Sequence, residues 1–201
     1  AKYPKLLAKM VKAGFKLLSL GIESPHDYIL DQLNKGFDSN TIRKAFTVLK
    51  KYPIFYHGFF IYGNLGETEE EMLYIAEFSK EIDVDSIAFS KLRVDKYSPL
   101  REMAKKTPGY HVTDRGELYS DKYSHPALKR IGRRIKFSFY TPSRFLKMLS
   151  KCFFVVRIFT FSETVSFLVV MPRVLKSVIV REIQKGRFGD TLKRVFISNE
   201  S

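Results

Sequence analysis

The chain has 201 residues, enough for one or two domains with a hydrophobic core. A hydrophobic content of 45% excludes an intrinsically disordered chain. The single cysteine, Cys152, excludes an internal disulfide, a cysteine-based zinc site and an iron–sulfur cluster held by three cysteines of this chain. No stretch of 18 uncharged apolar residues is present, so no membrane-spanning helix is expected.

The net charge of +14 is concentrated in the second half of the chain. Residues 1–100 carry 14 basic and 13 acidic side chains, whereas residues 101–201 carry 21 and 8. Such a break indicates two regions with different partners, and the basic region suits an anionic surface. One cysteine favours a reducing setting, so we expect a cytoplasmic protein. The chain begins without Met and inside a helical pattern, and we interpret it as a fragment.

The first half of the chain alternates helical patterns with short apolar runs. Apolar residues recur at helical spacing over Tyr3–Ala13. The apolar run that follows, Phe15–Ile22, is nearly continuous, which is typical of a parallel strand covered on both faces. Helix starts are predicted at Ser24, Ser39, Thr68 and Ser98. The order of elements predicts an α/β architecture with three parallel strands, at 15–22, 54–62 and 86–92.

The remainder of the chain has a different pattern. A small hairpin is predicted around Asp114–Gly116, with the glycine in the left-handed conformation. From residue 125 onward the chain is helical and basic, with helix starts at Thr141 and Thr160 and a break or kink at Pro172. We therefore divide the chain into an α/β region (1–108), a connecting loop (109–124) and a basic helical tail (125–201).

Polar residues follow the first two predicted strands. Glu23 ends the first strand, and the Gly63–Glu67 turn follows the second. Ligands bind at the carboxyl ends of parallel strands, so we expect both on one open rim, with Lys35 within reach. The Glu23 carboxylate can accept hydrogen bonds from a ribose diol or an ammonium group. The alternative for Glu23 is a helix cap, and for Lys35 a solvated side chain near a helix end.

Three segments in this order resemble the second half of a radical S-adenosylmethionine (SAM) core, most closely that of the cobalamin-binding subgroup. They are Gly21-Ile-Glu-Ser24, Leu33-Asn-Lys-Gly36 and Phe60-Ile-Tyr-Gly-Asn-Leu-Gly-Glu-Thr68. The resemblance covers residues 1–108 and implies half of a TIM-like barrel. It also implies SAM-binding roles for seven residues, namely Glu23, Ser24, Lys35, Ile61, Gly63, Asn64 and Gly66.

Within this resemblance, Lys35 would pair with the SAM carboxylate and the Gly63 turn would cradle the adenine. The family commonly has Pro where this chain has Leu65, which puts the rigidity of the turn in doubt. A tight turn between a strand and a helix uses glycine in any case. Lys91 and Arg93 would face the substrate or another domain, and a solvated loop is the alternative.

The resemblance also implies chemistry that this chain does not carry. A radical SAM enzyme holds a [4Fe–4S] cluster through a Cys-x3-Cys-x2-Cys motif, which is absent here, and no cobalamin domain is present. The longer protein from which this fragment comes would use SAM, the [4Fe–4S] cluster and, in the cobalamin subgroup, cobalamin for a radical-based modification such as methylation. The N-terminal half would then be this chain's partner, and this chain alone would not be an enzyme.

The basic tail allows more than one interpretation. Residues 129–187 hold 14 basic and 2 acidic side chains among many aromatic ones. Basic helices with apolar faces are typical of membrane-surface segments, which would place the protein at the inner face of the membrane. The alternative is that the tail packs on the α/β region. Nucleic-acid binding is disfavoured by the high apolar content. A rival to the enzyme hypothesis is therefore a non-catalytic module that docks on anionic membranes.

Overall fold

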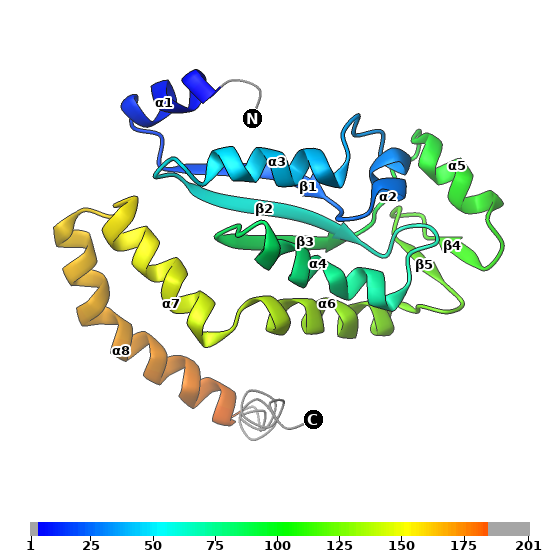
Figure 1. Cartoon of the computed structure of the whole chain (residues 1–201). Helices are drawn as coiled ribbons and strands as arrows, with labels where there is room; N and C mark the ends of the chain where they lie inside the picture. Colours follow the sequence, from blue (N-terminus) through cyan, green and yellow to red (C-terminus); the bar gives the residue numbers. More distant parts are fainter. Residues whose placement is uncertain (1–3, 185–201) are drawn as a thin grey trace. The chain divides into compact units, whose positions relative to one another are not determined.

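The computed structural model describes residues 4–184 (Figure 1), except for several side chains after residue 166. The chain folds into two compact units. The first unit ends at Ile158, and the second begins at Phe159. The elements of the first unit are α1 (Pro4–Lys12), β1 (Leu17–Glu23), α2 (Asp27–Gln32), α3 (Ser39–Leu49), β2 (Phe55–Tyr62), α4 (Glu69–Glu81), β3 (Ser86–Lys91), α5 (Pro99–Lys106), β4 (Tyr110–Val112), β5 (Leu118–Ser120), α6 (His125–Phe139), α7 (Pro142–Ser150) and the π-helical turn η1 (Lys151–Val155).

The central sheet has three parallel strands in the order β1-β2-β3. Leu17 pairs with Phe55, and His57 pairs with Ser86. The three parallel strands predicted from the sequence are therefore confirmed within about two residues at each end. Among the described residues the sheet does not close into a barrel, so the fold is a mixed α/β arrangement with an open parallel sheet.

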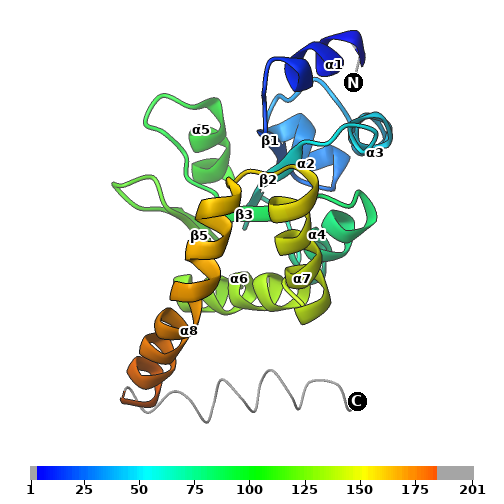
Figure 2. The ribbon, with the colours of Figure 1, turned by 90° about the vertical axis from the view of Figure 1, so that its left-hand side faces the viewer.

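Three helices cover one face of this sheet. Helices α3, α4 and α6 lie along that face (Figures 1 and 2), and their apolar side chains share one core with Ile22, Tyr56 and Phe60 of the strands. On the opposite face Leu17 and Phe59 remain 48% and 44% exposed. The expectation that β1 is buried on both faces is therefore wrong, because Leu17, Ser19 and Gly21 on this face are exposed.

The predicted helix starts are mostly confirmed, with two corrections. Thr68 and Glu71 form the predicted capping box of α4. Ser24 does not cap α2. Its hydroxyl instead accepts a hydrogen bond from the backbone N–H of His26, which is the N-cap residue. Asp38, rather than Ser39, caps α3 by accepting a hydrogen bond from Thr41 N–H.

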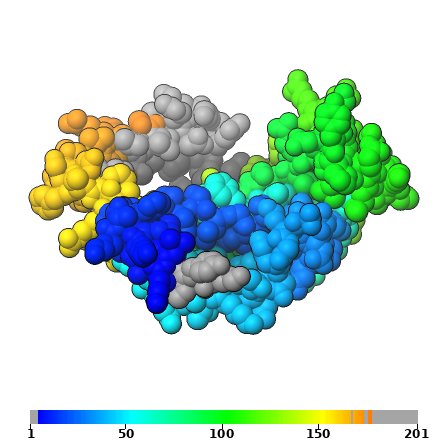
Figure 3. Space-filling model, turned by 90° about the horizontal axis from the view of Figure 1, so that it is seen from above, coloured from blue at the N-terminus to red at the C-terminus, as the bar shows by residue number. Residues whose placement is uncertain are grey.

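Beyond the carboxyl ends of the strands, α5 and the antiparallel β4–β5 hairpin form a second, smaller core. Figure 3 shows this part in green, projecting at one end of the first unit. The predicted hairpin is confirmed, and Gly116 has a φ of +79°. A Cβ atom at Gly116 would lie 2.4 Å from the Val94 carbonyl oxygen, so the close approach of the two loops requires glycine.

The first part of the basic tail packs on the α/β region. Phe139 of α6 is fully buried, and the Tyr140 hydroxyl donates to the Ile87 carbonyl at 2.7 Å. In α7 and η1, three basic side chains form ion pairs with two acidic residues that directly precede β3. These pairs are Arg144 and Lys147 with Asp83, and Lys151 with Asp85. The packing alternative is therefore confirmed for α6. Helices α7 and η1 contain no buried residues and leave Phe145, Leu146 and Phe154 exposed, so ion pairs rather than an apolar face connect them to the α/β region.

The second unit contains α8 (Phe161–Gln184), which begins at a Thr160–Glu163 capping pair as predicted. It continues through Pro172 as one helix, so the predicted break there is absent. Phe161, Leu168 and Val169 are exposed. No helix in the described part of the chain is long and apolar enough to cross a membrane.

Candidate functional site

The carboxyl edge of the sheet brings together residues from three separate segments. Glu23 pairs with Phe60, and Lys91 pairs with Tyr62, which directly precedes Gly63. Parallel strands necessarily place their carboxyl ends at one edge, so Glu23, the Gly63 turn and Lys91 lie at the same edge of the sheet, as expected. Figure 1 shows α2, α5 and the β4–β5 hairpin beyond that edge.

Glu23 sits in an irregular conformation at the end of β1. The register of β1 shifts between Gly21 and Glu23, and Glu23 has a φ of +67°. Its side chain folds back over Gly21, where an added Cβ would lie 2.6 Å from the Glu23 Oε1 atom. A side chain larger than hydrogen at position 21 would therefore collide with this carboxylate. The sequence signal for this arrangement is the Gly21-Ile-Glu motif itself.

Lys35 reaches Glu23 from the loop that follows α2. Asn34 and Gly36, on either side of Lys35, both have positive φ angles, so the chain turns sharply here. The Lys35 Nζ atom donates to Glu23 Oε1 at 2.8 Å, and both side chains are partly exposed. The predicted proximity of Glu23 and Lys35 is thus present, and the two groups form a solvent-accessible ion pair.

Among the other predicted site residues, Ser24 and Asn64 are buried, whereas Gly63 is partly exposed and Gly66 is exposed. The Asn64 amide donates to the Ile61 carbonyl and to Glu67. The Gly66 backbone is exposed, and its N–H donates to the Tyr110 hydroxyl at 2.7 Å. Ile61 is partly buried against the smaller core. These residues shape the turn rather than offering free side chains.

Lys91 and Arg93 are engaged with the hairpin and its neighbours. Lys91 Nζ lies 3.8 Å from a carboxylate oxygen of Glu117 and 3.3 Å from Nδ1 of His125. The Arg93 guanidinium donates to the Arg115 carbonyl at 3.0 Å. Both cations therefore contact the hairpin, Lys91 as a partly buried side chain and Arg93 as an exposed one, which agrees with the solvated-loop alternative for Arg93.

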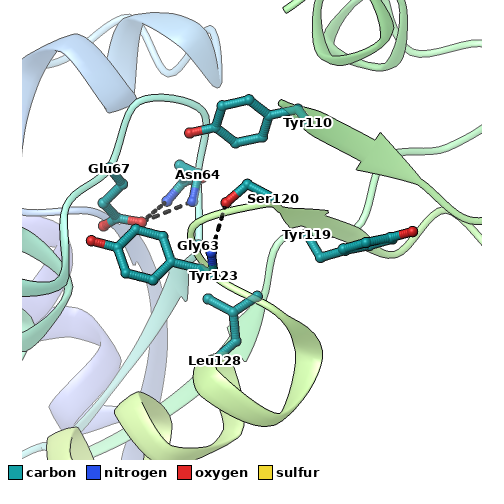
Figure 4. A pocket seen from close by; sticks show the side chains of 8 residues that line it. All are labelled: Gly63, Asn64, Glu67, Tyr110, Tyr119, Ser120, Tyr123 and Leu128. Atoms are coloured by element: carbon teal, nitrogen blue, oxygen red, sulfur yellow. Dashed lines mark hydrogen bonds between the residues drawn. The ribbon is translucent and has the colours of Figure 1, made fainter. Parts of the chain in front are cut away.

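A carboxylic acid that the sequence analysis did not single out lies beneath the turn. Glu67 is only 2% exposed, and its Oε2 atom accepts hydrogen bonds from Asn64 N–H at 2.8 Å and from the Asn64 side-chain amide at 3.0 Å (Figure 4). Burial, which disfavours the charged form, raises the pKa of Glu67 to about 7. The sequence signal was its place in Gly-Asn-Leu-Gly-Glu-Thr, but a turn motif alone does not reveal burial.

The described residues contain no group of three His, Cys, Asp or Glu side chains that could hold a metal ion. Cys152 lies in η1, where its neighbours include Asp85 at the amino end of β3, and burial raises the pKa of its thiol. A lone thiol at that end of the sheet does not fit a [4Fe–4S] cluster at the carboxyl edge.

Comparison with known proteins gives a distant relative that matches part of this chain. No family model matches it. Over 116 residues the chain is 31% identical to the uncharacterized protein MJ0486 of Methanocaldococcus jannaschii, an archaeon. The match takes in 57% of this chain and 36% of that relative, so the chain spans about a third of the length of the relative.

Proposed function

We propose that residues 1–108 form the SAM-binding part of a radical SAM-type barrel in a longer protein. The observation that carries this proposal is the partly exposed Glu23–Lys35 pair at the carboxyl edge of the parallel sheet. It offers one anionic and one cationic group at the edge where α/β folds bind ligands. The longer relative, of which only 36% is matched, is consistent with additional domains in such a protein.

The chemistry of the pair suits the zwitterionic amino-acid end of SAM. Opening the salt bridge by rotation of two side chains would let Glu23 accept from the ligand ammonium while Lys35 donates to its carboxylate. The exposed ring of Phe59, on the same face as Gly21, offers an apolar surface to the adenosine. When bound, SAM would supply a methyl group or a radical precursor. This chain's residues would bind and orient it.

The [4Fe–4S] cluster does not fit the residues of this chain, which has one cysteine and, among its described residues, no metal-ligating group of three. In this proposal the cluster and cobalamin both belong to the rest of the longer protein, and the chain supplies neither a ligand to iron nor a reaction step through it. The reaction class proposed for that protein is a radical-based modification such as methylation.

Isothermal titration of SAM into the protein tests the binding role. Replacing Glu23 by Gln or Lys35 by Met removes one half of the pair, and each should weaken SAM binding about tenfold or more, because a charge-assisted hydrogen bond contributes roughly 1.5–3 kcal/mol. The matched control is Lys105→Met, which breaks an exposed ion pair with Glu102 on α5 and should leave the affinity unchanged. Equal affinity in wild type and both site variants would refute the assignment.

A second candidate function is membrane docking through the second unit. The observation that favours it is the exposure of apolar side chains along the first half of α8, together with Arg173 and Lys176 farther along the same helix. Each basic group near an anionic bilayer contributes on the order of 1 kcal/mol, and apolar side chains add insertion energy. We infer that α8 lies on an anionic membrane surface.

Co-sedimentation with liposomes tests this second function. Binding should require anionic lipid, weaken at high salt and fall in the double variant Arg173→Glu/Lys176→Glu. The control variant Lys129→Glu/Arg130→Glu makes the same charge change on the exposed side of α6 and should bind as wild type does. Equal binding to neutral liposomes would contradict the electrostatic mechanism.

A further inference from the structure

Two neighbouring cavities lie between the Gly63–Thr68 turn and the β4–β5 hairpin. The inner one has a volume of about 10 Å³, enough for one group of the size of a water molecule. The outer one has a volume of about 230 Å³. Four residues line both cavities, and they are Glu67, Tyr110, Ser120 and Tyr123. A small ligand can therefore place a head group in the inner cavity and its body in the outer one.

The inner cavity has two buried acceptors with unmet hydrogen-bonding capacity. Among the described residues, neither the Oε1 atom of Glu67 nor the Oδ1 atom of Asn64 has a hydrogen-bond partner. Leaving a buried polar atom unpaired costs about 1–3 kcal/mol, so these two oxygens favour a ligand that donates hydrogen bonds. Both residues line the inner cavity, as Figure 4 shows.

We propose that the two cavities bind a small organic molecule that carries an ammonium group, with the ammonium in the inner cavity between Glu67 and Asn64. The proposal is independent of SAM binding at Glu23 and Lys35, which lie in other segments of the chain and line neither cavity.

The surroundings of the inner cavity favour a cation over an anion. Tyr110, Tyr119 and Tyr123 line it. Figure 4 shows the rings of Tyr110 and Tyr123 beside Asn64 and Glu67, whereas the Tyr119 ring points away, and aromatic rings attract ammonium groups. An ammonium also has enough N–H groups to satisfy both unpaired oxygens at once. An anion would be repelled by Glu67 and by nearby Glu71. The one basic side chain that lines the outer cavity, Lys122, is exposed and lies over the Tyr123 ring.

The protonation of Glu67 provides a signature for this mode of binding. The pKa of Glu67 is raised to about 7, so the free site is largely neutral at pH 6 and ionised at pH 8. A bound cation favours the carboxylate, so its affinity should rise as the pH increases over this interval. The other titratable or charged groups around the turn come from three places: His26 and Tyr28 at the start of α2, Glu69 and Glu71 on α4, and Tyr110, Asp121, Lys122 and Tyr123 on the hairpin and its ends.

Ethylammonium chloride is the probe, followed by the ¹H–¹⁵N amide shifts of Asn64 and Gly66 in the full chain. The expected result is a saturable shift below about 100 mM, with potassium chloride and ethanol as controls for ionic strength and size. The dissociation constant should rise at least tenfold in Glu67→Gln. It should stay unchanged in Glu70→Gln, which alters an exposed carboxylate three residues away.

A second measurement keeps the test decisive if Glu67→Gln fails to fold. In wild-type protein, ethylammonium should bind several-fold more tightly at pH 8 than at pH 6. An absence of saturable shifts would overturn the proposal, as would equal binding of ethanol or affinity independent of pH. Unaltered affinity in folded Glu67→Gln would overturn it too. SAM binding to the Glu23–Lys35 pair can succeed or fail separately, because its variants and its probe are different.

Discussion

At the residue scale, Glu67 is the group whose environment departs most from that of a free side chain. It is buried beneath the Gly63 turn, and its pKa is raised from 4.5 to about 7. Between these two values the folded protein holds a proton that the unfolded chain has lost. The contribution of Glu67 to the free energy of unfolding should therefore be greatest below pH 4.5 and fall by about 3 kcal/mol as the pH rises to 7.

Urea unfolding at pH 5 and pH 8 measures this effect, with Glu67→Gln as the comparison. From pH 5 to pH 8 the wild-type protein should lose more unfolding free energy than the variant does, because Gln does not ionise. The exposed Glu70→Gln variant should show no such shift. A difference that is constant with pH would mean that Glu67 titrates normally in the folded protein.

At the scale of an element, α7 and η1 are fixed to the α/β region by ion pairs of unequal burial. Asp85 accepts hydrogen bonds from Lys151 Nζ at 2.6 Å and from Tyr56 N–H at 2.7 Å, and its side chain is only 6% exposed. Lys147, which pairs with Asp83, has a side chain that is 59% exposed. Burial, rather than the number of pairs, should therefore decide which contact stabilises this connection.

We expect Asp85→Ala to lower the free energy of unfolding by roughly 3 kcal/mol, because it leaves a partly buried ammonium and a backbone N–H without their acceptor. Lys147→Ala should cost less than about 1 kcal/mol, as exposed pairs usually do. Urea unfolding of the two variants at neutral pH makes the comparison. Similar losses in both would show that the buried pair does not anchor this connection.

At the scale of the whole molecule, the two hydrophobic cores belong entirely to the first unit. Among the residues whose burial the structure describes, the buried core residues lie between Leu7 and Val156. A chain that ends after Ile158 should therefore keep a cooperative unfolding transition, with a free energy within about 1 kcal/mol of the full chain. It should at the same time lose liposome binding if α8 is the docking element. Loss of the cooperative transition in circular dichroism would show that the second unit is needed for folding.

Local patterns in the sequence predict the elements of the α/β region and their order. Apolar runs, capping residues such as Thr68, and turn glycines such as Gly116 act over a few residues, so their consequences can be predicted locally. The motif around Glu23 likewise indicated its place at a strand end. The resemblance to a radical SAM core added the hypothesis of a SAM site, which the geometry at Glu23 and Lys35 makes testable.

Which faces of the strands are buried depends on how distant segments pack, and it became visible in the folded protein. An apolar strand such as β1 does not reveal how many of its faces find a covering helix, because this depends on where distant segments pack. For the same reason, the sequence did not show that Asn64 and Glu67 turn inward beneath the hairpin. Nor did it show that basic residues of α7 and η1 neutralise Asp83 and Asp85. Burial and charge pairing between distant segments arise from the packing of the whole unit, and they set the chemistry of its side chains.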